Sequence, residues 1–383
     1  MNGIPADWAC SLVDPLLFRE EQQALAHVWT FLGLTGDVAR DGDWIRATIA
    51  TRSVFVQRFG DELRGFENIC AHRFYPLRNA DKGNGPLICG FHNWQYNRDG
   101  VAVGIPICTE VYGKPPHAMG ARLAPIEIET CGSLIFGRFP SPVATQSLED
   151  FLGDGFVILD TMTRMTVPPR YMSTTIRANW KLNMHVTLDD YHGPSIHPST
   201  FGRDGYLDVA KRRYVRLGAA HSAFLATKDA GAFDRLLAGC CEGTYRSAHY
   251  FILQILPDLM ISHVAGRRPF WFVNIAQYVA RAPDETAFRS WSFPAPFAAP
   301  LSWPERATRP VTDLFRHPIY FHYYKRVVRE DIAVCERLQK VAHQVDRAPL
   351  LGALEERIAW YEESLQELSG SGVKAVNVQE TGQ

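Results

Sequence analysis

Two short segments, each with one cysteine and one histidine, constrain this chain more than any other feature. They are Cys70-Ala-His72 and Cys89-Gly-Phe-His92, separated by sixteen residues. Thiolates favour iron–sulfur clusters and zinc, whereas imidazoles favour zinc, iron and copper. Zinc sites with two cysteines and two histidines usually group like ligands along the chain. Here each segment supplies one ligand of each kind, which favours two irons, one held by the cysteines and the other by the histidines.

That ligand set is the one of a Rieske [2Fe–2S] centre. At these residues the sequence resembles the Rieske-type non-haem iron oxygenases, specifically the large (alpha) oxygenase component of the aromatic-ring-hydroxylating family. The resemblance implies that Cys70, His72, Cys89 and His92 bind the cluster and that Trp94 covers it. A zinc module is the competing interpretation, and the alternation of ligand types argues against it.

The resemblance extends from about Trp44 to Gln339, with departures in the cluster loops. Many family members have glycine after the arginine of the first loop, where this chain has Phe74. They also have proline after the second cysteine and glycine after the second histidine, where this chain has Gly90 and Asn93. We expect these changes to affect loop stiffness and cluster exposure and to leave the ligand geometry intact.

A second group of polar residues lies between Asn179 and Pro198. On a continuous helix His185, Asp189 and His192 would share one face, at i, i+4 and i+7. His197 would then point elsewhere, but Gly193-Pro194 can break the helix and turn His197 back towards His192. Two imidazoles and one carboxylate with open positions form the facial triad of non-haem Fe(II) oxygenases.

The order Asp189-x-Tyr-His192-x₄-His197-Pro, after Asn179-Trp-Lys, resembles the iron-binding motif of the same family. In that family the carboxylate ligand comes from an acidic pair in a C-terminal helix, which implies Asp331 here, with Glu330 as the competitor. Many members carry Glu-Asn where this chain has His185-Val186. We expect His185 to hydrogen-bond Asp189 from one helical turn away.

The composition is that of a soluble globular protein. Of 383 residues 46% are hydrophobic and 21% charged, which are ordinary values, and the length allows two domains. A formal net charge of −1 argues against nucleic-acid binding. The sequence contains no recognisable secretion signal and no apolar stretch long enough to cross a membrane. We therefore expect a cytoplasmic protein that does not bind membranes.

The predicted first domain covers residues 1–140, with a β core at 38–140 that carries the cluster ligands. A helix is predicted over 14–34, where Asp14 fits an N-cap and Pro15 the first helical position. Runs of β-branched and apolar residues between turn signals predict strands. These strands cover 47–51, 53–59, 62–69, 87–88, 126–129 and 133–139.

The predicted second domain covers residues 141–383, after Pro140-Ser-Pro142, and ends in a disordered tail at 369–383. Its predicted elements are a helix at 147–153, strands at 170–178, 206–217, 246–256, 269–281 and 285–293, and amphipathic helices at 310–345 and 349–368. The fold class is therefore α+β. An antiparallel β Rieske domain precedes a catalytic domain in which helices flank an antiparallel sheet, a START-like helix-grip arrangement.

The resemblance implies a terminal oxygenase that uses O₂ to hydroxylate or oxidatively demethylate a small organic substrate. Ring cis-dihydroxylation is the alternative. Family members form head-to-tail homotrimers, in which one subunit's cluster lies beside the next subunit's iron. By its position, Asp189 bridges His192 of its own chain and His92 of the neighbour. The sequence shows no NAD or flavin fingerprint, so the electrons of NAD(P)H must come through a separate reductase, with or without a ferredoxin.

A non-enzymatic iron–sulfur electron carrier is the candidate from another class, although the second motif would then be superfluous. The substrate stays open. Aromatic residues between 198 and 297 could sandwich an arene or a quaternary ammonium, and most of them belong to the core. They are Phe201, Tyr206, Phe224, Trp271, Phe272, Tyr278, Trp291 and Phe293. The basic run 211–213 could attract an acidic substrate or donor, and the six cysteines outside the cluster are expected to be buried thiols.

Overall fold

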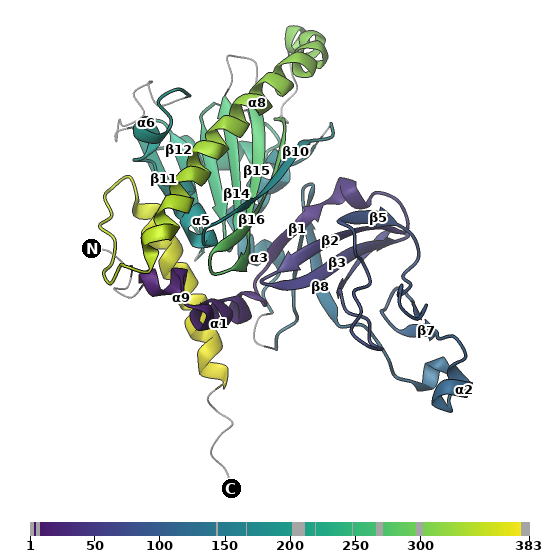
Figure 1. The fold of residues 1–383 in the computed structure, drawn as a ribbon. Helices are drawn as coiled ribbons and strands as arrows, with labels where there is room; N and C mark the ends of the chain where they lie inside the picture. The colour runs from purple at the N-terminus through teal and green to yellow at the C-terminus, as the bar shows by residue number, and fades with distance from the viewer. Residues whose placement is uncertain are drawn as a thin grey trace. The chain divides into compact units, whose positions relative to one another are not determined.

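The computed structural model of the protein describes residue 4 and residues 8–142, 145–165, 167–200, 211–218, 220–246, 248–265, 271–295 and 302–376 (Figure 1). The chain forms two compact units. We call Leu25–Leu148 the small unit, and Met1–Ala24 together with Glu149–Gln383 the large unit. Within the described ranges, no helix is both long and apolar enough to cross a membrane.

The small unit is an antiparallel seven-stranded sheet in the order β1-β9-β8-β4-β3-β2-β5. Its strands are β1 (Thr30–Leu34), β2 (Asp43–Ile49), β3 (Arg52–Phe59), β4 (Glu62–Glu67), β5 (Lys82–Asn84), β8 (Pro125–Cys131) and β9 (Leu134–Arg138). A two-stranded hairpin of β6 (Gln95–Tyr96) and β7 (Ala102–Gly104) and the short helix α2 (Cys108–Tyr112) complete it. The predicted small antiparallel β domain is confirmed.

The helix predicted over 14–34 is wrong in its second half. Helix α1 covers only Pro15–Leu25, and Thr30–Leu34 forms β1, which pairs with β9. All five residues of β1 are buried. Tertiary pairing therefore outweighs the helical pattern, because aromatic and β-branched residues at 28–31 suit a buried strand.

Most of α1 belongs to the large unit, although sequence analysis grouped it with the β domain. A buried ion pair explains this placement. Lys181 Nζ lies 2.7 Å from Glu21 Oε2 and 2.6 Å from Ser11 Oγ, and Trp180 Nε1 donates to Glu21 Oε1. A buried charge is tolerated only when it is paired, so these contacts hold α1 against the large unit.

The large unit contains a second antiparallel sheet of seven strands, in the order β10-β16-β15-β14-β13-β12-β11. Its strands are β10 (Arg170–Ile176), β11 (Arg212–Leu217), β12 (His221–Ala226), β13 (Phe251–Ile255), β14 (Leu259–Ala265), β15 (Trp271–Ala282) and β16 (Glu285–Pro294). The long helix α8 (Trp303–Ala342) runs across the sheet (Figure 1). The predicted α+β class, with helices flanking an antiparallel sheet, is confirmed.

The remaining helices of the large unit are α3 (Leu148–Leu152), α4 (Asp154–Met162), α5 (Trp180–Leu188), α6 (Gly193–Ile196), α7 (Ala232–Cys241) and α9 (Glu356–Val376). Strands β12 and β14 and helices α4 and α7 were not predicted. Most residues of β12 and β14 are buried, and strands buried on both faces lose the alternating pattern by which sequence analysis finds them.

Two smaller differences concern the tail and the cysteines. Residues 369–376 of the predicted tail belong to α9, residues 377–383 lie outside the described ranges, and so do residues 206–210 of a predicted strand. Cys10 and Cys241 are exposed, whereas the other four cysteines outside the cluster motif are buried. The expectation of six buried thiols is therefore wrong for two of them.

The two cysteine–histidine loops of the small unit share one backbone geometry. The Cys70 N–H donates to the Tyr75 carbonyl, and the Cys89 N–H donates to the Trp94 carbonyl, each at 2.9 Å. In return the N–H groups of Phe74 and Asn93 donate to the carbonyls of Cys70 and Cys89. Phe74 and Asn93 both have positive φ, 61° and 55°. These are the positions where the resembled family favours glycine, because glycine adopts this conformation without strain.

Phe74 should therefore store strain. Its φ of 61° is costly for a bulky L-residue, and its side chain is 79% exposed, so little packing offsets the cost. We expect Phe74→Gly to raise the free energy of unfolding by about 0.5 to 1 kcal/mol. This value is the backbone strain that glycine relieves minus the conformational entropy that glycine adds to the unfolded chain. The thermal unfolding midpoint would measure it. The matched control Phe91→Gly, in the other loop without positive φ, should lower the midpoint, and an equal effect of both changes would contradict the strain argument.

Candidate metal centres

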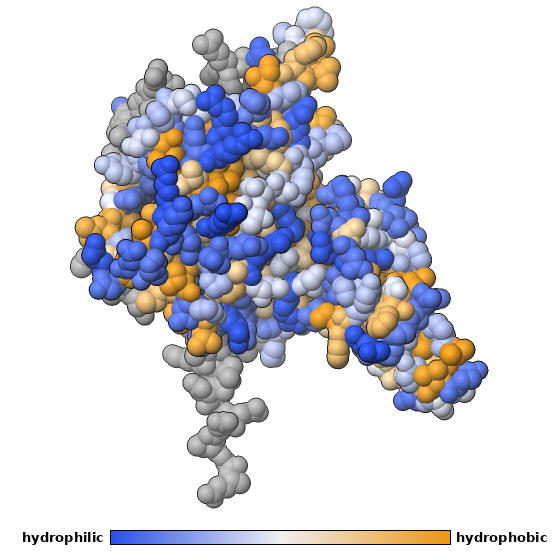
Figure 2. Space-filling view, in the orientation of Figure 1, coloured by the Kyte–Doolittle hydropathy of each residue, from blue (hydrophilic) through white to orange (hydrophobic). Residues whose placement is uncertain are grey.

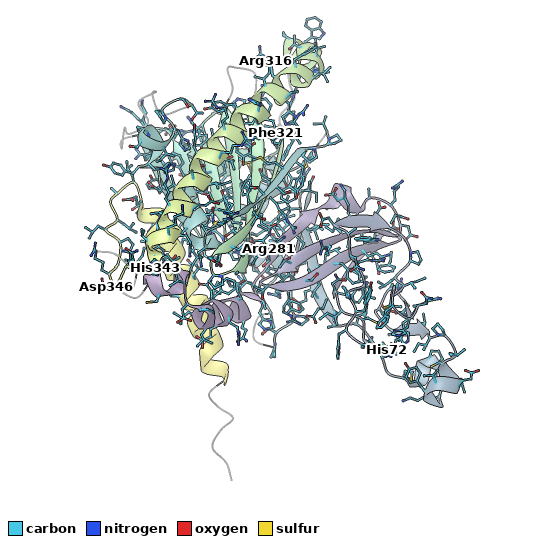
Figure 3. The ribbon with its side chains drawn as sticks, viewed as in Figure 1. His72, Arg281, Arg316, Phe321, His343 and Asp346 are labelled. Atoms are coloured by element: carbon cyan, nitrogen blue, oxygen red, sulfur yellow. The ribbon has the colours of Figure 1, made fainter. Side chains whose placement is uncertain are left out.

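The cysteine–histidine quartet lies at the loop end of the small unit, where Figure 3 labels His72 beside α2. Cys70 and Cys89 are buried in a small core with Trp94 and Tyr96. The rings of His72 and His92 lie 4.6 Å apart, and Trp94 stacks on His72 at 4.8 Å with an interplanar angle of 1°. The fold therefore brings all four predicted cluster ligands together, with the thiols inside and the imidazoles towards the surface.

The hydrogen bonds of each side chain indicate which of its atoms are available to bind a cluster. His72 Nδ1 is buried and has no hydrogen-bond partner among the described residues, while His72 Nε2 lies 3.1 Å from the Tyr112 hydroxyl. Burial raises the pKa of Cys89, and the adjacent Cys70 thiol adds to this rise. The Phe91 and His92 N–H groups bond the Cys89 sulfur and oppose the rise. Buried thiols beside inward-facing amides suit thiolates bound to iron.

Tyr96 makes the closest polar contact to the quartet. Its hydroxyl oxygen accepts from the Ala71 N–H at 3.2 Å and lies 3.0 Å from Cys70 Sγ. Because the oxygen already accepts from an amide, its own proton is free to be donated to the sulfur. Neither Tyr96 nor Tyr112 lies inside the spaced cysteine–histidine motif, so the motif alone does not identify them.

In the large unit α5 ends at Leu188, and Asp189 adopts an extended conformation with φ −86° and ψ 113°. Asp189 Oδ1 accepts from the N–H groups of Tyr191 (2.6 Å) and His192 (3.2 Å). Such a side-chain turn competes with helix continuation. The predicted continuous helix through His192 is therefore wrong, and Gly193-Pro194 begins the short helix α6 rather than ending a longer one.

The turn nevertheless brings the two histidines together, as Gly193-Pro194 was expected to do. His192 Nε2 and His197 Nε2 lie 3.2 Å apart. Asp331 Oδ1, from α8, lies 3.0 Å from His197 Nε2 and 3.5 Å from His192 Nε2. Among the described residues, this triad has three ligand atoms within 4.8 Å of one another. Its geometry suits a single metal ion with room for further ligands.

The other nitrogens of both histidines face carboxylates. His197 Nδ1 lies 2.7 Å from Glu330 Oε2, and His192 Nδ1 lies 3.4 Å from Asp189 Oδ2. Glu330 and Asp331 thus lie on opposite sides of the His197 ring. Only Asp331 lies near the Nε2 atoms of both histidines. Carboxylates behind metal-binding histidines fix the ring orientation and raise the basicity of the ligand.

The electrostatics of the triad favour a cation. Burial lowers the pKa of His192, but the carboxylates of Asp189 and Asp331 overcome it and raise that pKa to about 10. Burial likewise opposes ionisation of Asp331, yet His192 and His197 hold its pKa below the usual range. Asp331 Oδ1 has no hydrogen-bond partner among the described residues although it is buried. A metal ion would satisfy that oxygen and both Nε2 atoms.

His185 does not contact Asp189 through its side chain, contrary to expectation. Its Nε2 lies 2.7 Å from Glu362 Oε1 in α9, and its ring stacks on Trp8 at 4.9 Å. The Asp189 N–H bonds the His185 carbonyl, as in the last turn of a helix. His185 therefore anchors α5 to α9 and to the N-terminal segment, which a local helical pattern cannot reveal.

A cavity of about 600 Å³ opens beside the triad, between the sheet and α8. Of the aromatic residues singled out in the sequence, Tyr278 lines it, together with Tyr250, Tyr320, Tyr323 and Tyr324. Phe201 and Tyr206 lie outside the described residues, and the other five do not line the cavity. Lys211 and Arg212 also line it, with Arg212 3.8 Å from the buried Asp190.

Comparison with known protein families agrees with this geometry. Residues 28–115 match the Rieske [2Fe-2S] domain, and residues 159–370 match the catalytic domain of ring-hydroxylating alpha subunits. The chain belongs to the ring-hydroxylating alpha-subunit family. The matched regions contain the quartet and the triad respectively.

The chain is also similar in sequence to large subunits of named dioxygenases. The chain is 28% identical over 259 residues to the anthranilate 1,2-dioxygenase large subunit of Acinetobacter baylyi, covering 64% of this chain and 52% of that protein. It spans about half the length of the curated relatives it matches.

Solved structures share the fold. Naphthalene 1,2-dioxygenase from Rhodococcus sp. superposes with a TM-score of 0.74 at 21% identity, over 94% of this chain and 93% of that one. A quaternary ammonium Rieske monooxygenase superposes with a TM-score of 0.70 at 16% identity, over 94% of both chains.

Both implied cofactors fit the residues present. A Rieske domain implies a [2Fe–2S] cluster, and the buried thiols with the free His72 Nδ1 suit it. The alpha-subunit catalytic domain implies a mononuclear iron, and the triad supplies the two imidazoles and one carboxylate that such iron uses. Glu330 supports His197, and Glu362 binds His185. Both roles depend on contacts between distant parts of the chain.

The triad predicts different effects for the two neighbouring acids of α8. We expect Asp331→Ala to lower the iron content from about three to about two per chain, with the visible spectrum of the cluster unchanged. Glu330→Gln should keep the third iron but bind it about tenfold to a hundredfold more weakly, because Glu330 supports His197 from behind. An iron assay after chelator dialysis measures both. Loss of the third iron in Glu330→Gln alone would contradict the assignment.

Proposed function

We propose that this protein is the terminal oxygenase of a multicomponent Rieske system. It would use O₂ and electrons from an NAD(P)H-dependent reductase to hydroxylate or oxidatively demethylate a small organic molecule. The observation that carries the proposal is that one chain holds both a cysteine–histidine quartet and a histidine–carboxylate triad that opens into a cavity. An electron carrier would need only the quartet.

In the proposed reaction, the cluster supplies single electrons and the mononuclear iron activates O₂ when both are bound. The protein's own residues orient the ligands and shape the cavity. Asp189 and Glu330 hold His192 and His197 with Nε2 towards the triad. Tyr278 donates to Thr187 Oγ1, since the Thr187 hydroxyl itself donates to the Asn183 carbonyl.

The substrate we propose is a planar aromatic molecule. Five tyrosines line the cavity, and offset stacking and edge contacts with such rings favour aromatic ligands. The named relatives act on anthranilate and naphthalene, which supports the same class. Ring dihydroxylation is the alternative outcome. Lys211 and Arg212, which also line the cavity, would attract an acidic substituent of the substrate.

We further propose a homotrimer in which the cluster of one subunit serves the iron of the next. Both cluster histidines are partly buried, but His72 is hydrogen-bonded within its own unit by Tyr112, whereas His92 forms no such bond with the described residues. His92 is therefore the ligand available to a second chain. Exposed apolar side chains surround these loops (Figure 2), namely Phe74, Phe91, Ile107 and Val111. They suit a surface that a second subunit covers.

The proposed function is tested by oxygen consumption. The iron-loaded protein, a surrogate reductase with or without a ferredoxin, and NADH are supplied with a panel of arenes, aromatic acids and quaternary amines. We expect arenes to stimulate O₂ uptake and to yield hydroxylated products. Formaldehyde release would identify demethylation instead, and a diol would identify dioxygenation. A protein with about three irons per chain that never consumes O₂ would contradict the proposal.

Asp189 tests the route of the electrons. We expect Asp189→Asn to retain both metal centres while turnover falls by a hundredfold or more, on the order of what removal of a key polar group costs. The reason is that the amide loses the negative charge that would bridge His192 and the His92 of a neighbour. Iron content, cluster spectrum and single-turnover kinetics measure this. An Asp189→Asn protein with normal transfer from the reduced cluster would exclude the bridge.

A further inference from the structure

One end of the cavity carries neutral hydrogen-bonding groups in otherwise apolar walls. Asn274 of β15 donates through Nδ2 to the Tyr320 hydroxyl (2.5 Å) and to Ser262 Oγ (3.2 Å). All three residues line the cavity, where their neighbours include Ile252 and Val264. Ser262 and Asn274 are directly paired across β14 and β15, so their side chains point to the same face of the sheet.

The direction of these hydrogen bonds determines what the group can offer. In this arrangement both N–H groups of the Asn274 amide are used, and its carbonyl oxygen is buried without a partner among the described residues. The reversed amide would leave two donors unpaired, which costs more. Tyr320 and Ser262 therefore accept from Asn274. Their own hydroxyl protons meet no acceptor in the part of the chain that the structure describes, so both hydroxyls can donate to a ligand.

This group lies far from the triad. Tyr320 and Asp331 lie on the stripe of α8 that lines the cavity. They are eleven residues apart, which corresponds to about 16 Å along a helix. On β15, Asn274 lies four residues, or about 13 Å, from Tyr278, whose hydroxyl lies 3.1 Å from Thr187 Oγ1, two residues before Asp189. Both spacings separate this group from the metal-binding residues. The cavity is long, with the metal-binding residues at one end and the hydrogen-bonding group at the other.

We propose that Tyr320 and Ser262, oriented by Asn274, bind a hydrogen-bond-accepting oxygen of the substrate, of the neutral carbonyl type, at the end of the cavity remote from the triad. The group is neutral because none of its three side chains carries a charge, which suits a neutral oxygen. A few well-placed polar groups in an apolar pocket fix ligand orientation. This subsite would therefore decide which ring carbon faces the iron, and it rests on the proposed function only in taking this cavity as the substrate site.

The test compares two probes of nearly the same shape, 2-acetylnaphthalene with a carbonyl and 2-isopropenylnaphthalene without one. Dissociation constants for the iron-loaded protein are measured by calorimetry without oxygen. The quantity of interest is the ratio of the two affinities. We expect Tyr320→Phe to lower the preference for the acetyl probe about tenfold, the loss of one buried hydrogen bond. Ser262→Ala should lower it in the same direction, and it serves as the test if Tyr320→Phe fails to fold.

Tyr324→Phe is the matched control. Tyr324 lies one turn along the same stripe of α8, lines the same cavity, and has its hydroxyl 3.0 Å from Ser290 Oγ. We expect it to leave the affinity ratio unchanged. Ratios equal to the wild-type value in both Tyr320→Phe and Ser262→Ala would overturn the subsite, as would an equal loss in Tyr324→Phe. Binding needs no turnover, so a protein that shows the preference but never consumes O₂ would contradict the proposed function and not the subsite.

Discussion

The mononuclear site depends on the hydrogen bonds from the Tyr191 and His192 N–H groups to the Asp189 carboxylate. They end α5 at Leu188 and turn the chain, so that the short helix α6 presents His197 to His192. On a straight helix the two imidazoles would diverge. The other oxygen of the same carboxylate lies 3.4 Å from His192 Nδ1. One side chain therefore shapes the backbone and orients the histidine that it helped to place.

The rest of the large unit supports this turn from two directions. Helix α8 delivers Asp331 to the Nε2 side of both histidines and Glu330 to the Nδ1 side of His197. Helix α9 holds the start of the turn, because Glu362 binds His185 one turn before Asp189. Burial opposes ionisation of Glu362, and the His185 contact holds its pKa below the usual range. The buried Lys181–Glu21 pair adds the N-terminal segment to the same framework.

The quartet of the small unit is asymmetric in a way that its motif does not show. The two loops have matching backbone bonds and matching positive φ values at Phe74 and Asn93, yet their histidines differ. Tyr112 and Trp94 contact His72, whereas the His92 ring forms no hydrogen bond with the described residues. Since the backbone is nearly repeated, the asymmetry comes from α2, a segment outside both loops.

The sequence alone determined the chemistry of both centres, because ligand types and short spacings along the chain are local properties. Cys70, His72, Cys89, His92, His192 and His197 were found in this way, and the resemblance to the family added the acidic pair containing Asp331. Tertiary structure decided what depends on distant segments: the choice of Asp331 over Glu330, the partner of His185, and the conversion of Thr30–Leu34 into a strand. It also decided the cavity, since tyrosines of β15 and α8 meet only when the helix crosses the sheet. Local patterns specify which groups are present, and packing specifies which of them meet.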